Sequence, residues 1–268
     1  MIHISGLIKI YKTKEQQQTA VNNISLCLPS TGMIFITGES GSGKSTLLNL
    51  IGGLDSATYG EIVVDGNNLS KLSEKELTNY RSSYLGFIFQ DYSLIKDFSV
   101  YKNVKLSLDI IGDTDYSKVD DVLDKVGLTN YKTRHSNQLS GGQCQRVAIA
   151  RAIVKDPKII LCDEPTGNLD SENSKQVLDI LKKLSKDRLV LVVSHNIEDA
   201  KHYADRIIEL KDGTIVSDQQ NNLQSNFLIE NNTLYVGNIS KLSEEELSNI
   251  NANINVNLNL NSPKMNKN

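Results

Sequence analysis

A glycine-rich stretch at residues 38–45 carries residue types that hold phosphate. It reads Gly-Glu-Ser-Gly-Ser-Gly-Lys-Ser, matches the pattern GxxxxGK[ST], and follows an apolar run at residues 33–37. Glycines let consecutive backbone N–H groups turn toward a phosphate chain, and a helix that begins there adds its positive dipole end. We therefore predict a nucleoside triphosphate site, in which Lys44 reaches the β- and γ-phosphates and the Ser45 hydroxyl ligates Mg²⁺. The other predicted phosphate contacts are Gly38, Ser40, Gly41, Ser42, Gly43 and Thr46.

An acidic strand end supplies the carboxylates that hydrolysis of a triphosphate requires. Residues 159–162 are apolar, and Asp163 and Glu164 follow them directly. Asp163 is expected to hold Mg²⁺ through its water shell, and Glu164 to polarise the attacking water as a general base. Many strands end in acids, so this pattern indicates hydrolysis only because it accompanies the phosphate-binding loop.

A second phosphate-binding pattern, Leu-Ser-Gly-Gly-Gln, occupies residues 139–143 and is called the signature motif below. Its glycines allow close backbone approach, its serine offers a hydroxyl, and a helix that begins there directs its positive end outward. Because the chain already has one loop for this phosphate, we predict that the signature motif serves a nucleotide held by a neighbouring copy. The candidate contacts are Ser140, Gly141, Gly142 and Gln143.

Taken together, these motifs resemble those of ATP-binding cassette (ABC) ATPases over roughly residues 1–218. The resemblance implies three further site residues. Tyr11 matches the aromatic residue that stacks on adenine, and Gln90 matches the glutamine that touches Mg²⁺ or the attacking water. His195 matches the histidine that contacts the γ-phosphate. ATP and Mg²⁺ are the cofactors that the resemblance implies.

The resemblance also implies how copies of the chain associate. Residues 168–170, Asn-Leu-Asp, match the family's loop that crosses the interface between two cassettes, and they add Asp170 to the candidates. A homodimer is expected in the ATP state, with the signature motif of each copy closing over ATP held by the other. Residues 38–46, 139–152 and 163–171 resemble the lipoprotein-releasing and macrolide-exporter type, which includes antimicrobial-peptide transporters.

The predicted function is therefore an ATP-hydrolysing motor of a membrane permease, for export or extraction of a lipoprotein, peptide or antimicrobial. The permease is expected to be either a separate subunit or a fused domain. Aromatic and aliphatic residues between positions 90 and 103 offer a docking surface for it, or else form the core of a helical subdomain.

Composition bounds the competing functions. The chain has 268 residues, 29 basic and 32 acidic, and a net charge of −3, which argues against a nucleic-acid partner. The first twelve residues lack the apolar h-region of a signal peptide, and no apolar run approaches the roughly 20 residues that cross a bilayer. We expect a cytoplasmic protein held at the inner face of the cell membrane by its permease. The alternative is a soluble ABC protein acting on the ribosome or DNA, against which the single cassette argues.

An α/β fold of the P-loop NTPase type must position these motifs. We predict a mixed core sheet, an N-terminal antiparallel β-subdomain, and an inserted helical subdomain at about residues 91–156. The cassette is expected at residues 1–218, followed by an Asn-rich extension or linker at 219–268 whose order the sequence leaves open. The expected core strands are residues 33–37, 85–89, 158–162 and 189–193, with a hairpin at 207–216; the expected N-terminal strands are residues 2–10, 21–28 and 61–64.

Some smaller features complete the sequence predictions. Ser73 and Glu76 have the spacing of a capping box that opens a helix. Residues 68–77 recur in similar form at 238–247, either as two capped helices with the same start signal or as a mimic of a docking helix. The three cysteines are expected to be buried apolar residues, and Cys162 is hypothesised to make the site sensitive to thiol modification because it precedes Asp163.

Overall fold

The computed structural model describes residues 1–12, 17–221, 227–230 and 233–236. The chain forms two compact units, Met1–Asn221 and Asn222–Asn268, which are described separately. In the second unit, β11 (Phe227–Glu230) and β12 (Thr233–Val236) form an antiparallel hairpin. The repeat at residues 238–247 and the alternating Asn pattern at 249–261 lie outside the described residues.

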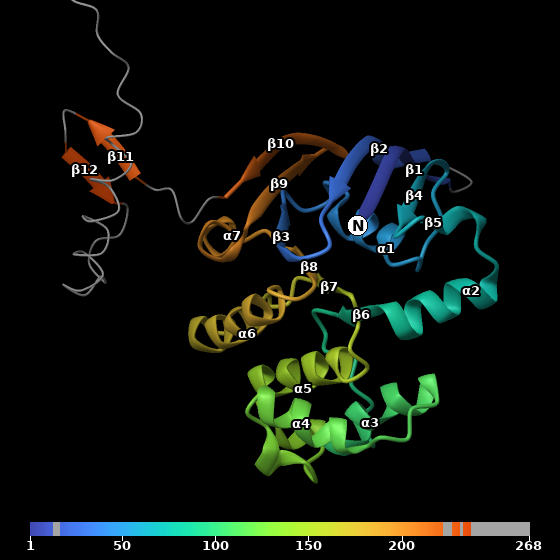
Figure 1. Ribbon diagram of the computed structural model, residues 1–268, viewed down its shortest axis with the longest axis vertical. Helices are drawn as coiled ribbons and strands as arrows, with labels where there is room; N and C mark the ends of the chain where they lie inside the picture. The colour runs from blue at the N-terminus through green and yellow to red at the C-terminus, as the bar shows by residue number, and fades with distance from the viewer. Residues whose placement is uncertain (13–16, 222–226, 231–232, 237–268) are drawn as a thin grey trace, which may run out of the picture. The chain divides into compact units, whose positions relative to one another are not determined.

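The N-terminal part of the first unit is an antiparallel sheet with the strand order β2-β1-β4-β5 (Figure 1). Apolar side chains alternate along its strands, so one face packs on the interior; Ile2, Ile4 and Leu7 of β1 are all buried. The predicted antiparallel β-subdomain is confirmed. Its strands are β1 (Ile2–Lys12), β2 (Gln17–Leu28), β4 (Tyr59–Val64) and β5 (Asn67–Asn68).

A second sheet, ordered β10-β9-β3-β8-β7-β6, is parallel except for the antiparallel pair β9 and β10, as predicted for a mixed core sheet. Its central strands are continuously apolar because both faces are covered. Met33 and Phe35 of β3 face one hydrophobic core, whereas Ile34 and Ile36 face the other. The strands are β3 (Gly32–Thr37), β6 (Leu85–Ile88), β7 (Ile159–Asp163), β8 (Leu189–Val193), β9 (Arg206–Lys211) and β10 (Thr214–Gln220).

Helices cover this sheet, and α3, α4 and α5 group together beyond β6 and β7 (Figure 1). The three predicted helix starts are confirmed: α1 begins at Lys44, Ser73 and Glu76 form the capping box of α2, and α5 begins at Gly141. The helix α5 ends at Ile153, three residues before Asp156 and Pro157. The helices are α1 (Lys44–Ile51), α2 (Glu74–Asn79), α3 (Val100–Ile111), α4 (Ser117–Lys125), α5 (Gly141–Ile153), α6 (Ser171–Leu184) and α7 (Ile197–Tyr203).

Single helical turns connect these elements. A π-helical turn, η2, joins α2 to β6 and brings Tyr80 over the end of α1, where its hydroxyl donates to the Ile51 carbonyl oxygen at 2.9 Å. The 3₁₀ turn η4 directly precedes the signature motif. The turns are η1 (Leu69–Lys71), η2 (Tyr80–Tyr84), η3 (Thr129–Tyr131) and η4 (Ser136–Gln138).

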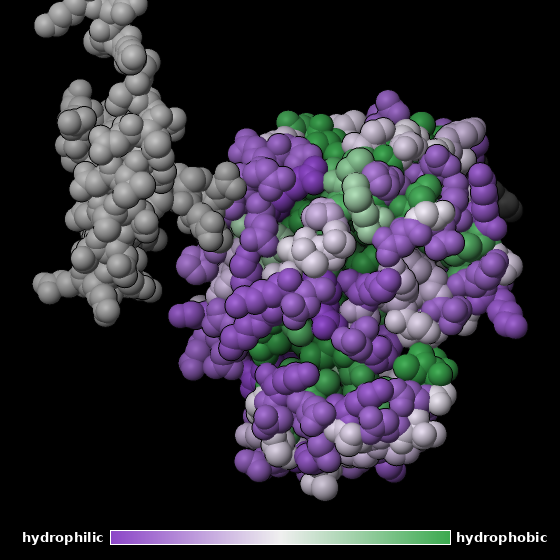
Figure 2. Space-filling model, viewed as in Figure 1, coloured by the Kyte–Doolittle hydropathy of each residue, from purple (hydrophilic) through white to green (hydrophobic). Residues whose placement is uncertain are grey.

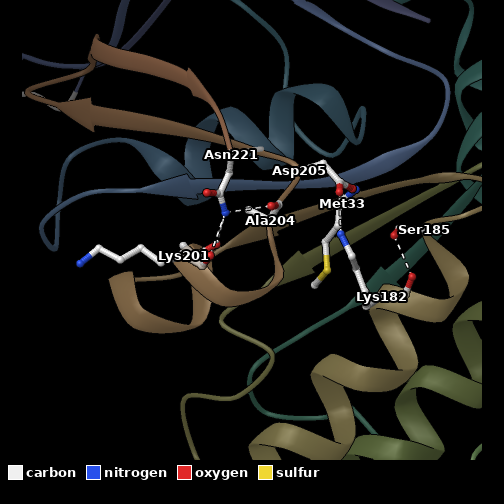
Figure 3. Close-up of polar contacts among 8 residues, drawn as sticks. Met33, Lys182, Ser185, Lys201, Ala204, Asp205 and Asn221 are labelled. Atoms are coloured by element: carbon white, nitrogen blue, oxygen red, sulfur yellow. Dashed lines mark hydrogen bonds and ion pairs between the residues drawn. The ribbon is translucent and has the colours of Figure 1, made fainter. Parts of the chain in front are cut away.

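Polar contacts fasten the end of the first unit to α7 (Figure 3). The Asn221 side-chain amide donates to the carbonyl oxygens of Lys201 at 2.8 Å and Ala204 at 2.9 Å. Nearby, the Asp205 carboxylate accepts from the Met33 backbone N–H at 2.7 Å and from Lys182 at 2.6 Å. Asn221 is the last residue of the first unit, three positions after the boundary at 218 that the composition suggested.

Candidate functional site

The phosphate-binding loop is shaped by close backbone contacts. A Cβ atom added at Gly38 or Gly43 would lie 2.1 Å from a backbone oxygen, and both residues have positive φ, so only glycine fits there. Lys44 is only 6% exposed, and its ammonium group donates to the carbonyl oxygens of Gly38 at 2.9 Å and Glu39 at 2.7 Å. The Ser42 hydroxyl is buried and has no hydrogen-bond partner among the described residues. This cradle of donors suits a phosphate chain.

Beside the loop, two of the three predicted Mg²⁺ residues meet. The Ser45 hydroxyl donates to Asp163 Oδ1 at 2.8 Å, which links the first turn of α1 to the end of β7. Burial raises the pKa of the Asp163 carboxyl, the Ser45 hydrogen bond lowers it, and the neighbouring Glu164 charge raises it. Hydroxyl, carboxylate and amide oxygens are the hard ligands that Mg²⁺ prefers, so these residues and the nearby Gln90 fit that ion.

The predicted general base has a strained backbone. Glu164 has a φ of 48°, and its N–H donates to the Val193 carbonyl oxygen at 3.0 Å. A non-glycine residue in this region costs about 1–2 kcal/mol, and such strain is often found at functional sites. The Glu164 Oε1 atom lies 3.0 Å from Nδ1 of His195, so the carboxylate and the imidazole orient each other.

A cleft of about 430 Å³ brings the separate motifs together. It is lined by the phosphate-binding loop and the start of α1, and by six residues from other segments: Tyr11, Gln18, Ala20, Gln90, Glu164 and His195. Its volume lies within the usual range for small-molecule sites. Sequence segments that are up to 184 positions apart, from Tyr11 to His195, therefore converge on one concave surface.

Asp55 orients Tyr11 in this cleft, and the sequence had not identified it. The Tyr11 hydroxyl donates to Asp55 Oδ2 at 2.8 Å, and Lys9 donates to Oδ1 at 2.6 Å. The Tyr11 ring remains 40% exposed. Burial, together with Asp55, raises the pKa of the Tyr11 phenol. A single sequence gives no signal that an aspartate 44 positions away bonds to Tyr11, so this contact could not be predicted.

The signature motif, in contrast, does not line the cleft. Ser140 caps α5 in a reciprocal box: its N–H donates to Gln143 Oε1 at 2.9 Å, and its hydroxyl accepts from the Gln143 N–H at 3.3 Å. Gly142 packs against α6, where an added Cβ would lie only 2.0 Å from Oδ1 of Asn173. Asp170 caps α6 and accepts from the Asn173 N–H at 2.8 Å. The signature motif, which the sequence predicts to bind phosphate, therefore lies outside the cleft that contains the chain's own phosphate-binding loop.

Comparison with known proteins gives the same assignment as this geometry. The family model described as "ABC transporter" matches residues 21–167, which is more than half of the chain. The chain belongs to the ABC transporter family. An uncharacterized ABC transporter ATP-binding protein of Methanocaldococcus jannaschii is 41% identical over 220 residues, covering 81% of this chain and 98% of that protein. This agreement confirms the family predicted from the motifs.

Other relatives are longer than this cassette. The macrolide export ATP-binding/permease protein MacB of Bdellovibrio bacteriovorus is 41% identical over 221 residues. That match covers 82% of this chain but 34% of MacB, so the chain spans about one third of that relative's length. The resemblance of the cassette to the macrolide-exporter type is confirmed.

A solved structure shows the same fold. The dimeric, post-hydrolysis structure of the ATP-binding cassette MJ0796, bound to ADP and Pi, superimposes with a TM-score of 0.76 at 38% identity. It covers 82% of this chain and 99% of that cassette. The predicted α/β P-loop fold is thereby confirmed.

Across the ranges described in the first unit, none of the helices is both long and apolar enough to span a membrane.

The cysteines of the cassette differ from the sequence prediction. Cys27 is exposed, so the expectation of three buried cysteines is wrong for that residue. Cys162 is completely buried on β7, and burial raises the pKa of its thiol, which disfavours the reactive thiolate. The hypothesis of a thiol-sensitive site at Cys162 is therefore not supported by its surroundings.

Alkylation of the native cassette at neutral pH is expected to label Cys27 and leave the rate of ATP hydrolysis unchanged. Cys144 and Cys162 are both buried, and burial raises the pKa of each thiol. Mass spectrometry of protease digests identifies the labelled residue, and a phosphate-release assay on the same sample gives the rate. Labelling of Cys162 as fast as Cys27 would contradict this expectation.

Proposed function

We propose that this cassette binds and hydrolyses ATP, and that ATP-driven head-to-tail dimerisation of two copies powers a membrane permease. The observation that carries the proposal is the separation described above: one cleft contains the phosphate-binding loop, Glu164 and His195, whereas the signature motif lies outside it. A second copy would complete the site. The ATP-binding cassette MJ0796, which shares this fold, is itself dimeric with ADP and Pi bound.

Different residues bind the adenine ring and the phosphate chain of the nucleotide. Tyr11 stacks on the adenine ring, and its hydroxyl bond to Asp55 fixes the ring's orientation. Lys44 exchanges its two carbonyl partners for the β- and γ-phosphates, so its buried charge stays paired throughout. Backbone N–H groups of the loop and the Ser40, Ser42 and Thr46 positions complete the phosphate contacts.

Ser45, Asp163 and Gln90 would hold Mg²⁺. When bound, the ion neutralises charge on the β- and γ-phosphates. The existing bond between the Ser45 hydroxyl and Asp163 keeps both oxygens in one place before the ion arrives. Asp163 must be ionised to bind a cation, and its raised pKa makes metal binding weaken as the pH falls toward that pKa.

We assign hydrolysis to Glu164 and His195. Glu164 accepts a proton from the attacking water as the water oxygen bonds to the γ-phosphorus, and the bond from that phosphorus to the bridging oxygen breaks, so that ADP leaves. His195 orients Glu164 and contacts the γ-phosphate. Asp170, at the cap of α6, belongs to the loop that meets the second copy. Ser140, Gly141, Gly142 and Gln143 of that copy present the start of their helix to the same phosphate.

The permease is expected to contact the surface around the segment that follows Gln90. In that segment Ile95 is 38% exposed, whereas Leu94 and Tyr101 pack on the interior. Apolar side chains also reach the surface near the helical group in the face shown in Figure 2. This contact would place the cassette at the inner face of the membrane.

The likeness to MacB, named for macrolide export, supports an exporter or extraction system whose cargo is an antimicrobial, peptide or lipoprotein. The relatives reported above are transporter cassettes or their fusions, and the chain's net charge of −3 supports no nucleic-acid partner. A ribosome- or DNA-directed ABC protein therefore has no specific observation in its favour.

The dependence of the ATPase rate on chain concentration tests the proposed mechanism. If two copies complete each site, the rate per chain with saturating Mg-ATP rises with concentration and then levels off as the dimer forms. Adding an excess of the Ser140→Arg chain should suppress the wild-type rate, because mixed dimers contain an obstructed signature motif. A rate per chain that is independent of concentration, in a sample that stays monomeric by light scattering, would overturn the proposal.

A further inference from the structure

The segment directly after Gln90 holds two consecutive residues in a strained conformation. Tyr92 has a φ of 63° and Ser93 a φ of 46°, and neither is glycine. The left-handed region costs about 1–2 kcal/mol for each such residue, so the surroundings must maintain the turn. Local bonds contribute, since the Ser93 hydroxyl donates to Asp91 Oδ1 at 2.7 Å. This local bond does not involve the backbone carbonyl oxygens of Tyr92 and Ser93.

Those backbone oxygens are held by Arg151 of α5. Its guanidinium donates from one terminal nitrogen to the Tyr92 carbonyl oxygen at 2.9 Å and from the other to the Ser93 carbonyl oxygen. A planar, permanently charged fork can hold two neighbouring acceptors in fixed positions, and its hydrogen bonds are stronger than neutral ones. Arg151 thus joins the strained turn to the helix that begins at the signature motif.

The same segment also touches the start of that helix and the loop at residues 168–170. The Tyr92 hydroxyl lies so close to Gly141 that an added Cβ there would be 2.9 Å from it. The Asn168 side chain donates to the Gln90 carbonyl oxygen at 3.2 Å. Gln90 is therefore carried by a turn that contacts both ends of α5 and the loop beside Glu164.

We propose that Arg151 is a positioning residue for hydrolysis. By holding the strained turn at Tyr92 and Ser93, it fixes Gln90 in the cleft and makes the Gln90 segment and the signature helix move as one body. The proposal rests on the proposed ATPase function and adds a residue that touches neither nucleotide nor metal. Without the guanidinium, the turn relaxes out of the left-handed region and Gln90 loses its position.

Arg151→Met is the first test, with Arg146→Met as its matched control. Arg146 lies on the same helix and is also partly buried, but it donates to Gln176 of α6 at 2.7 Å. For Arg151→Met we expect kcat to fall about tenfold or more, with the Kd for a fluorescent ATP analogue within about twofold of wild type. Arg146→Met should retain most of its kcat. Equal losses in the two variants would overturn the proposal.

Relief of strain provides a second test that a merely structural role would not pass. Glycine adopts the left-handed region without steric cost, so adding Ser93→Gly to Arg151→Met should recover a large part of the lost kcat. Failure of Ser93→Gly to recover any activity, in a variant that melts like wild type, would count against the proposal.

Hydrogen exchange without nucleotide separates this inference from the proposed function. The backbone amides of residues 91–95 should exchange faster in Arg151→Met than in Arg146→Met, whether or not the chain hydrolyses ATP. Unchanged exchange in that segment would overturn the role of Arg151. An inactive wild-type chain that nevertheless shows the exchange difference would overturn only the proposed ATPase function.

Discussion

Replacing Glu164 by glutamine is expected to stop ATP turnover and trap two copies around ATP. Glutamine keeps the size of the side chain and an oxygen that can accept from His195, which lies 3.0 Å away in the wild type. It cannot take a proton from water, and loss of a general base typically costs about 10²–10⁴-fold in rate. Phosphate release measures the turnover, and light scattering with Mg-ATP measures the dimer.

Glu198→Gln is the matched control for that experiment. Glu198 lies three positions after His195, in the first turn of α7, and its exposed carboxylate pairs with Lys201. Its replacement removes an equal charge near the cleft without touching the bond between Glu164 and His195. The control should hydrolyse ATP at close to the wild-type rate. A Glu164→Gln chain that stays monomeric in saturating Mg-ATP would contradict the ATP-sandwiched dimer.

The second large effect is expected from Gly142→Ala, which should reduce turnover about tenfold and leave ATP binding nearly unchanged. An added Cβ would lie 2.0 Å from Oδ1 and 2.8 Å from Cβ of Asn173, so α5 or α6 must shift. Overpacking of this kind costs about 1–3 kcal/mol. The phosphate-binding loop is in a different part of the fold, so affinity for a fluorescent ATP analogue should persist.

Two further variants make the Gly142 experiment specific. Asn173→Gly removes the atoms that clash and should restore turnover in the Gly142→Ala background. Gly112→Ala, at the end of α3, adds a Cβ with nothing within 4 Å at a residue with positive φ, so it reports the effect of backbone strain alone. Equal losses of turnover and nucleotide affinity in Gly142→Ala would refute the separation of binding from dimer closure.

The elements that were predicted correctly, and the site motifs that could be proposed from the chain alone, are those encoded by local sequence. A phosphate cradle needs its glycines and lysine within eight consecutive residues, and the buried strands β3, β7 and β8 are continuous apolar runs. The convergence of Tyr11, Gln90 and His195 came from resemblance to a family, not from periodicity. The comparisons confirm the family and the fold, while the individual roles of these residues stay predictions.

The residues that sequence reasoning missed act through tertiary contacts. Asp55 orients Tyr11, Asn173 sets the space beside Gly142, and Arg151 holds a turn about 58 positions earlier in the chain. None of these three residues belongs to a sequence motif that predicts which residue it contacts. The misjudged cysteine has the same cause, because exposure of Cys27 depends on which face of β2 is covered.

The contact between Gly142 and Asn173 has a consequence for cooperativity. Gly142 belongs to the motif that we propose serves the partner's ATP, whereas Asn173 donates two hydrogen bonds to Asp170, six positions after the chain's own Glu164. In a head-to-tail pair, each chain would therefore sense occupancy of both nucleotide sites through one rigid junction. The two sites should then bind and hydrolyse ATP cooperatively, with a Hill coefficient for ATP between about 1 and 2. The Asn173→Gly substitution should bring this Hill coefficient closer to about 1.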